Sequence, residues 1–304
     1  MQQVAPAAVL AHLSARDLGV FTGRAAVTAG VTRKQIAHLA ATGLIERLHP
    51  DVFRLTAATP SHAQRLRAGL LWTGPRAAAT GTSAAVAYRL ADVRPGLPEI
   101  AVPRDVRART DRLIVRHASN VAAMRVQRLG GIPVTGPAYT LLWLAHSFDA
   151  AGAEVAFEDA RRRRLVTIPS MQRYLDIFGR RGRPGVATMR ALLDVLDPDH
   201  PARSRLEVLT RRVLVAHGLT DFVRELPLTW NGRTYRYDFA FPARRTILEI
   251  NGRRWHDDAS DYERGQEKWS VPGRFGYRLV FATWDKVTRA PGSLIQELAA
   301  TLAA

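Results

Sequence analysis

Two carboxylates in the segment YRYDFAFPARRTILEINGRRWH (235–256) have the spacing of partners in a β-hairpin. Asp238 lies in an alternating run before the turn, and Glu249 lies in a second such run after it. A turn centred on Ala243 and Arg244 pairs the two residues directly, on one face, with Cβ atoms about 5 Å apart. Like charges placed so close repel each other, and a divalent cation between them would relieve the repulsion. Because hard oxygen ligands suit Mg²⁺ or Mn²⁺, we predict a site for one of these ions.

The two strands also predict which side chains face the core and which face this site. In the first strand the aromatic side chains share one face: Tyr235, Tyr237, Phe239 and Phe241. Asp238 points to the other face, because successive side chains of a strand alternate. In the second strand, Leu248 and Ile250 share one face, and Glu249 lies on the opposite face between Ile247 and Asn251.

Glu207 and Asn251 are further candidate ligands for the same ion. Glu207 lies near the start of a predicted helix, SRLEVLTRRVLVAHGL (204–219), from which it could reach the hairpin. Its alternative role is an ion pair with Arg211 one turn later, worth a few tenths of a kcal/mol. Asn251 could bind a metal, or take part in catalysis, through its side-chain carbonyl oxygen. It cannot serve as a base near neutral pH.

His256 and Lys268 are further candidate catalytic residues, beside Asp238 and Glu249. His256 follows the strand that contains Glu249. It could act as a general base or bind a water molecule that is itself bound to the phosphate. Its alternative role is that of a structural histidine beside Trp255. Lys268 lies on the next predicted helix, where it could supply positive charge to the site or pair with Glu263.

These residues occur in a characteristic order of elements: a helix, the hairpin, a second helix and the strand YRLVFATW (277–284). Four motifs accompany them: S-x-L-E at 204–207, Y-R-x-D-F at 235–239, a variant of E-x-D-G-R-x-x-H at 249–256, and G-Y-R…T-W at 276–284. Over about 100 residues the chain therefore resembles the PD-(D/E)xK endonuclease superfamily. Within that superfamily, it is similar to the widespread domain related to the very-short-patch-repair endonucleases.

The resemblance implies metal-dependent hydrolysis of DNA, with Arg253 and Arg254 neutralising phosphates next to the scissile bond. Three departures from the family pattern affect this expectation. Asn251 stands where this group has aspartate and the wider superfamily lysine, and Gly265 stands where an aspartate is common. Pro272 and Gly273 fall within what is usually an uninterrupted helix. These departures indicate chemistry moved onto other residues, or a weakened enzyme.

The N-terminal 56 residues predict a winged helix-turn-helix. Threonine N-caps at Thr22 and Thr32 begin the second and third short helices, after a first helix at 6–16. The segment LIERLHPDVFRL (44–55) then predicts a hairpin with its turn at 49–51. In this fold the third helix enters the major groove of DNA, N-terminus first. Its candidate DNA-binding residues are Arg33, Lys34, Gln35 and His38. The alternative is a solvated helix face.

Residues 57–200 predict a mostly helical region with strands at PEIAVP (98–103) and RLIVRHA (112–118). The winged helix followed by such a region resembles the AbiEi-type antitoxin proteins. Arginine clusters at 161–164 and 179–184 could bind phosphates or be solvated. Ser83 does not show the strand-to-helix context of a nucleophile elbow, so we interpret it as a helix start.

Composition points to a polyanionic partner. The 304-residue chain has 44 basic and 27 acidic residues, a net charge of +17, and all but three of the basic residues are arginine. Nucleic acid is the default partner for such a charge, although arginine richness can also reflect a GC-rich genome. The absence of cysteine excludes disulfides, zinc–thiolate sites and cysteine nucleophiles. No signal peptide or membrane span is apparent, so we expect a cytoplasmic protein.

Together these features predict a multi-domain α/β protein. Its parts are the winged helix (1–56), the mostly helical middle or regulatory region (57–200), and a restriction-endonuclease-like mixed β-sheet flanked by helices (201–304). We expect a metal-dependent endonuclease that acts on DNA, most simply double-stranded, in defence against foreign DNA (for example phage) or at a toxin–antitoxin-like locus. The alternative is an AbiEi-like repressor whose nuclease-like domain is inactive. RNA as the substrate and a homodimer as the assembly remain open.

Overall fold

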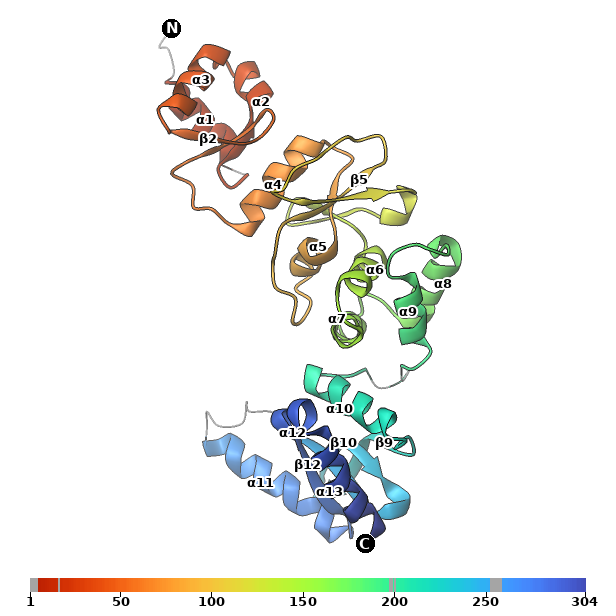
Figure 1. The fold of residues 1–304 in the computed structure, drawn as a ribbon. Helices are drawn as coiled ribbons and strands as arrows, with labels where there is room; N and C mark the ends of the chain where they lie inside the picture. The colour runs from red at the N-terminus through yellow and green to blue at the C-terminus, as the bar shows by residue number, and fades with distance from the viewer. Residues whose placement is uncertain (1–4, 16, 197–198, 200, 252–258) are drawn as a thin grey trace. The chain divides into compact units, whose positions relative to one another are not determined.

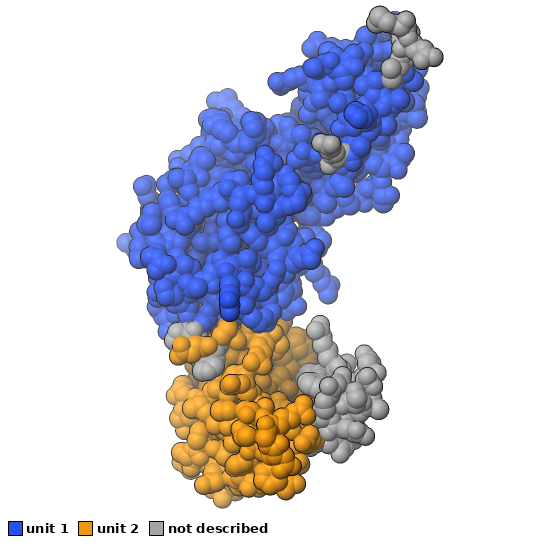
Figure 2. Space-filling view, turned by 180° about the vertical axis from the view of Figure 1, so that it is seen from behind, with its two compact units in different colours: residues 1–194 blue, residues 195–304 orange. Residues whose placement is uncertain are grey.

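The computed structural model describes residues 5–15, 17–196, 199, 201–251 and 259–304. The chain forms two compact units, residues 1–194 and 195–304 (Figure 2). Each unit holds mixed α-helices and β-sheets, as the predicted α/β class requires. Among the described residues, no helix is both long enough and apolar enough to cross a membrane.

The first unit begins with the predicted winged helix-turn-helix (Figure 1). Its elements are α1 (Pro6–Ser14), β1 (Val20–Thr22), α2 (Gly23–Thr28), α3 (Arg33–Ala41), β2 (Ile45–His49) and β3 (Val52–Leu55). The predicted caps are present: the Thr22 hydroxyl accepts the Ala25 N–H at 3.1 Å, and Thr32 caps α3. Strand β1, which was not predicted, completes a sheet in the order β1-β3-β2.

The middle of the chain contains more sheet than predicted. Helices α4 (His62–Thr73) and α5 (Gly81–Ala87) and a short 3-10 turn accompany a five-stranded sheet in the order β6-β5-β4-β8-β7. Its strands are β4 (Ala78–Ala79), β5 (Glu99–Pro103), β6 (Ile114–Ala118), β7 (Gln127–Leu129) and β8 (Ile132–Val134). Strands β5 and β6 are the two predicted ones. The others have two or three residues, too few for a visible alternation.

Four helices follow this sheet: α6 (Pro137–Ser147), α7 (Ala150–Arg162), α8 (Ile168–Phe178) and α9 (Val186–Leu193). The arginine cluster at the end of α7 is largely engaged within the protein. Arg161 pairs with buried Glu158 at 2.8 Å, and Arg162 and Arg163 both contact buried Asp159. These ion pairs stabilise the end of α7. The arginine cluster is therefore poorly suited to binding phosphate.

The interpretation of Ser83 as lacking a strand-to-helix context was wrong, because β4 directly precedes the turn into α5. Its hydroxyl is nevertheless buried, with the side chain 1% exposed. It accepts the Glu99 N–H at 2.8 Å and lies 3.1 Å from Nε2 of His62. These contacts give Ser83 a structural role at the start of α5.

The second unit is the predicted mixed sheet flanked by helices. Its elements are α10 (Arg205–Ala216), β9 (Val223–Trp230), β10 (Arg233–Phe241), β11 (Thr246–Asn251), α11 (Ala259–Arg274), β12 (Arg278–Thr283), α12 (Trp284–Arg289) and α13 (Pro291–Ala303). The strand order is β12-β11-β10-β9, with β11 and β12 parallel and the other pairs antiparallel. Helix α11 continues through Pro272, so this proline does not interrupt it.

The predicted alternation in β10 was partly wrong. Tyr235 and Tyr237 belong to the core cluster that includes Val271 of α11, whereas Phe239 and Phe241 pack with α10 and α13 on the other face. The face therefore changes at Asp238. Opposite this point in β9, Glu225 adopts a left-handed φ of +55°, and the regular pairing skips the position of Asp238.

Candidate functional site

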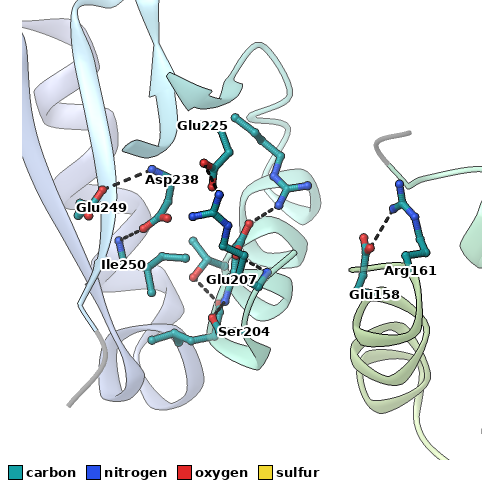
Figure 3. A network of polar contacts seen from close by, with 12 residues as sticks. Glu158, Arg161, Ser204, Glu207, Glu225, Asp238, Glu249 and Ile250 are labelled. Carbon is teal, nitrogen blue, oxygen red and sulfur yellow. Dashed lines mark hydrogen bonds and ion pairs between the residues drawn. The ribbon is translucent and has the colours of Figure 1, made fainter. Parts of the chain in front are cut away.

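The β10–β11 hairpin brings Asp238 and Glu249 together in the predicted register. Phe239 pairs with Leu248 and Ala240 with Ile247, and the same register sets Asp238 opposite Glu249. The Asp238 N–H donates to Oε2 of Glu249 at 3.3 Å. The Ile250 N–H donates to Oδ2 of Asp238 at 2.8 Å. Each carboxylate is therefore oriented by the backbone of the opposite strand (Figure 3).

The electrostatics of this pair suit a cation. Burial, and then the charge of Glu249, raises the pKa of Asp238 to about 7, although the Ile250 N–H and Lys268 oppose the shift. Burial also raises the pKa of Glu249 against the opposing charge of Lys268. Two buried carboxylates that disfavour their charged forms gain from added positive charge. Their hard oxygen atoms fit Mg²⁺ or Mn²⁺.

Lys268 of α11 joins this pair. Its Nζ contacts Oε1 of Glu249 in an ion pair, and it lies 5.3 Å from the centre of the Tyr237 ring. The Tyr237 hydroxyl donates to the Lys268 carbonyl at 2.6 Å. That carbonyl is available because Pro272, four residues on, has no N–H to complete the helical bond. The structure thus favours the prediction that Lys268 supplies charge to the site, while the side chain of Glu263 lies outside the described residues.

Glu207 is buried but has a different partner from the predicted ones. Its carboxylate contacts the guanidinium of Arg224 on β9, and both side chains are 4% exposed. It also accepts the Arg203 N–H at 2.7 Å, while its own N–H donates to the Ser204 hydroxyl at 3.1 Å. Within the described part of the chain, no group of three or more histidine or carboxylate side chains has the geometry to hold a metal. Asp238 and Glu249 are thus brought together, with Glu207 as a more distant charge that raises the pKa of Asp238 slightly.

Of the remaining predicted residues of this site, the structure describes Asn251. Asn251 ends β11, half-buried, in register with Thr283 of the parallel strand β12. Arg253, Arg254 and His256 lie outside the described residues.

Helix α3 presents the predicted DNA-binding residues in two different ways. Arg33, Lys34 and His38 are exposed, while Ile36 and Leu39 face the core. Gln35 is half-buried, and its side-chain oxygen accepts the Thr32 N–H at 2.8 Å in a capping box. The first three side chains are therefore available to a partner, and Gln35 also holds the helix end.

Sequence reasoning missed two residues: Tyr237, which contacts Lys268, and Arg224, which pairs with Glu207. Arg224 occurs in VRELPLTW (223–230), where it was not singled out as the partner of Glu207. Tyr237 was assigned to the core only. Its place beside Asp238 in the Y-R-x-D-F motif is a signal that could have identified it.

Comparisons with known proteins agree with the N-terminal fold. Residues 9–56 match the family model described as "Transcriptional regulator, AbiEi antitoxin". This match supports a DNA-binding regulator domain at the N-terminus. The likeness predicted from the winged-helix pattern is therefore confirmed for this part of the chain.

Two relatives of this chain are the uncharacterized proteins MT2308 and Rv2248 of Mycobacterium tuberculosis. Each is 28% identical to this chain over 176 residues, which are 58% of this chain and 64% of the relative. The match spans less than two thirds of the relatives' own length. A crystal structure of the RV2827C protein from the same species has 19% identity and a TM-score of 0.46, over 69% of this chain and 83% of that one.

Proposed function

We propose that this chain is a DNA-binding protein whose C-terminal unit hydrolyses DNA phosphodiester bonds with Mg²⁺ or Mn²⁺. The observation that carries the proposal is the buried pair of Asp238 and Glu249, with Lys268 in contact with Glu249. A hairpin that served stability alone would gain nothing from two buried carboxylates whose charges repel. The resemblance of this unit to the PD-(D/E)xK endonucleases supports the same function.

Each residue of the site would have its own role in the reaction. Asp238 and Glu249 would hold the cation, with Asn251 as an additional ligand, while Glu207 stays paired with Arg224. The bound cation supplies Lewis-acid chemistry, activating a water and offsetting negative charge on the phosphate. Lys268 carries N–H donors at the edge of the pair, where it can bind a phosphate oxygen or orient the attacking water. His256 would act as a base, and Arg253 and Arg254 would neutralise neighbouring phosphates.

The N-terminal unit would deliver this activity to DNA. The exposed Arg33, Lys34 and His38 of α3 are suited to phosphates and base edges in the major groove. Double-stranded DNA in the cytoplasm is the expected partner, and defence against foreign DNA or a toxin–antitoxin-like locus is the expected context.

A second candidate function is transcriptional regulation by a protein whose nuclease-like unit binds without cutting. The match of residues 9–56 to an antitoxin regulator family supports it, as does Asn251 in place of the usual aspartate or lysine. The two candidates share DNA binding and differ in cleavage.

The test is incubation of the full-length protein with supercoiled plasmid and Mg²⁺ or Mn²⁺. We expect nicked or linear plasmid with the wild type, and none with EDTA or with Asp238→Asn. Asp285→Asn is the matched control, because Asp285 is an exposed residue of the same unit that pairs only with Arg289 among the described residues. Wild-type protein that binds the plasmid but never cuts it would favour the regulator over the nuclease.

A further inference from the structure

The loop between β5 and β6, residues 104–112, reads RDVRARTDR and carries four arginines in nine residues. Its backbone is held in place. The Val106 N–H donates to the Pro103 carbonyl at 3.1 Å, and Nε2 of His117 lies 3.1 Å from the Val106 carbonyl. Ala108 is buried at 5% exposure. The arginines therefore project from an ordered backbone, which lowers the entropy lost when they bind a ligand.

Arg112 docks this loop on the wing of the winged helix. Its guanidinium donates to the main-chain carbonyls of Arg47, at 3.3 Å, and Leu48, at 2.9 Å, both in β2. Next to this contact, the ring of His49 stacks on Trp72 of α4 with centroids 4.7 Å apart and planes 3° apart. The wing is thus bonded to the loop and packed on α4.

The strand that accepts these hydrogen bonds, β2, also contributes to the core of the winged helix. Strand β2 contributes Ile45 to the same apolar cluster as Ile36 and Leu39 of α3. On its other side, Ala68 of α4 packs with Val20 and Val52 of the wing sheet. The loop is therefore linked through β2 to the packed body that holds α3.

Three arginines of the loop point their charge to solvent. Arg104, Arg107 and Arg109 are exposed, and none forms an ion pair within the described residues. Asp105 is neutralised from outside the loop by Arg76, which lowers the pKa of its carboxyl. Asp111 is the other carboxylate of the loop and is exposed. Counting Arg76, Arg104, Arg107, Arg109 and Arg112 against Asp105 and Asp111 leaves three net positive charges beside the wing.

We propose that the 104–112 loop is a second phosphate-binding surface, which contacts the backbone of duplex DNA next to the segment that α3 reads. The inference rests on the proposed DNA binding by α3. Arginine suits phosphate because its planar guanidinium can donate two parallel hydrogen bonds. Contacts of this kind position the protein and lengthen its footprint without reading sequence.

The test compares three variants of the full-length protein on random-sequence duplexes of about one helical turn and about three turns. The loop variant carries Arg104→Ala, Arg107→Ala and Arg109→Ala, and the α3 variant carries Arg33→Ala and Lys34→Ala. The control carries Arg94→Ala, Arg128→Ala and Arg173→Ala, which remove the same charge from exposed positions elsewhere in the unit. Thermal unfolding verifies that all three fold.

On the long duplex, we expect the loop variant to bind at least about tenfold more weakly than the control, with a salt dependence flatter by about 0.9 for each lost phosphate contact. On the short duplex, the loop variant should match the control. If the loop variant binds both duplexes as tightly as the control does, the loop proposal is overturned. If the α3 variant nevertheless binds more weakly than the control, the proposed DNA binding by α3 still stands. Tighter binding of single-stranded RNA than of duplex DNA would also overturn it. If the wild type binds neither duplex, both proposals fail.

Discussion

The N–H of Asp238 donates to Oε2 of Glu249 across the hairpin at 3.3 Å, so that two buried acids share one small site. Lys268 contacts the other oxygen of Glu249. When both carboxylates are ionised, the single positive charge of Lys268 leaves the site with a residual negative charge. Its stability should therefore depend on protons and cations in ways that can be measured.

The first prediction concerns pH. The folded pKa of Asp238 is raised to about 7 from its ordinary 3.8. Between these values the folded chain keeps a proton that the unfolded chain has released, so the free energy of unfolding falls as pH rises and levels off above about pH 7. The raised pKa of Glu249 acts in the same direction, and the two acids titrate as a pair. Denaturation in EDTA across this range should show the decline.

In Asp238→Asn the decline should become shallower, because one of the two titrating acids is gone. The contrary result would be a free energy of unfolding that rises from pH 4 to pH 7 in the wild type and follows the same course in the variant. It would mean that ionisation of the two carboxylates does not destabilise the folded protein.

The second prediction concerns Lys268, which offsets the charge of the pair when no metal is present. Lys268→Met should lower the melting temperature in EDTA, because it leaves buried carboxylates without their ammonium partner. Added Mn²⁺ should then raise the melting temperature more than it does in the wild type, since the cation replaces the lost charge. Lys268→Arg keeps the charge and is the control. Equal metal-induced shifts in all three proteins would contradict this account.

The third prediction separates two roles of Glu207. Glu207→Gln leaves the guanidinium of Arg224 buried without its carboxylate, which should cost about 3 to 5 kcal/mol of stability in EDTA. The control is Glu267→Gln, which breaks a more exposed pair with Arg233 and should cost at most about 1 kcal/mol. Urea denaturation measures both. If Glu207 served only as a metal ligand, its variant would lose metal binding without this loss of apo stability.

The fourth prediction uses the double role of Gln35. Gln35→Glu preserves the capping box, in which glutamate serves as well as glutamine, and suits the positive end of the helix dipole. The winged helix should therefore stay as stable or gain a few tenths of a kcal/mol. The new negative charge beside Arg33 and Lys34 should repel phosphate and weaken duplex binding. Unchanged affinity, measured at low salt by fluorescence anisotropy, would show that α3 does not approach DNA.

Some of this architecture was predictable because it depends on short-range patterns. The register of Asp238 and Glu249 follows from two alternating strands joined by a short turn, which leave few other pairings. The caps at Thr22 and Thr32 likewise follow from local chemistry.

Other features depend on the partner strand or on distant residues. The change of face at Asp238 accompanies the left-handed backbone of Glu225, which no pattern within β10 reveals. The two-alanine strand β4 has too few residues, and too little intrinsic preference for strands, to be recognised. The pairing of Glu207 with Arg224 joins residues of separate elements, and the helical pattern pointed instead to Arg211.

The most direct test of the central claim is a calorimetric titration of the full-length protein with Mn²⁺ at about pH 6, in buffers of different ionisation enthalpy. We expect the wild type to bind the ion and to release protons, since the pair holds at least part of a proton at this pH. Asp238→Asn should bind no ion at this site, and Asp285→Asn should behave as the wild type does. Identical titrations of Asp238→Asn and the wild type, or no binding by either, would contradict a metal centre at Asp238 and Glu249.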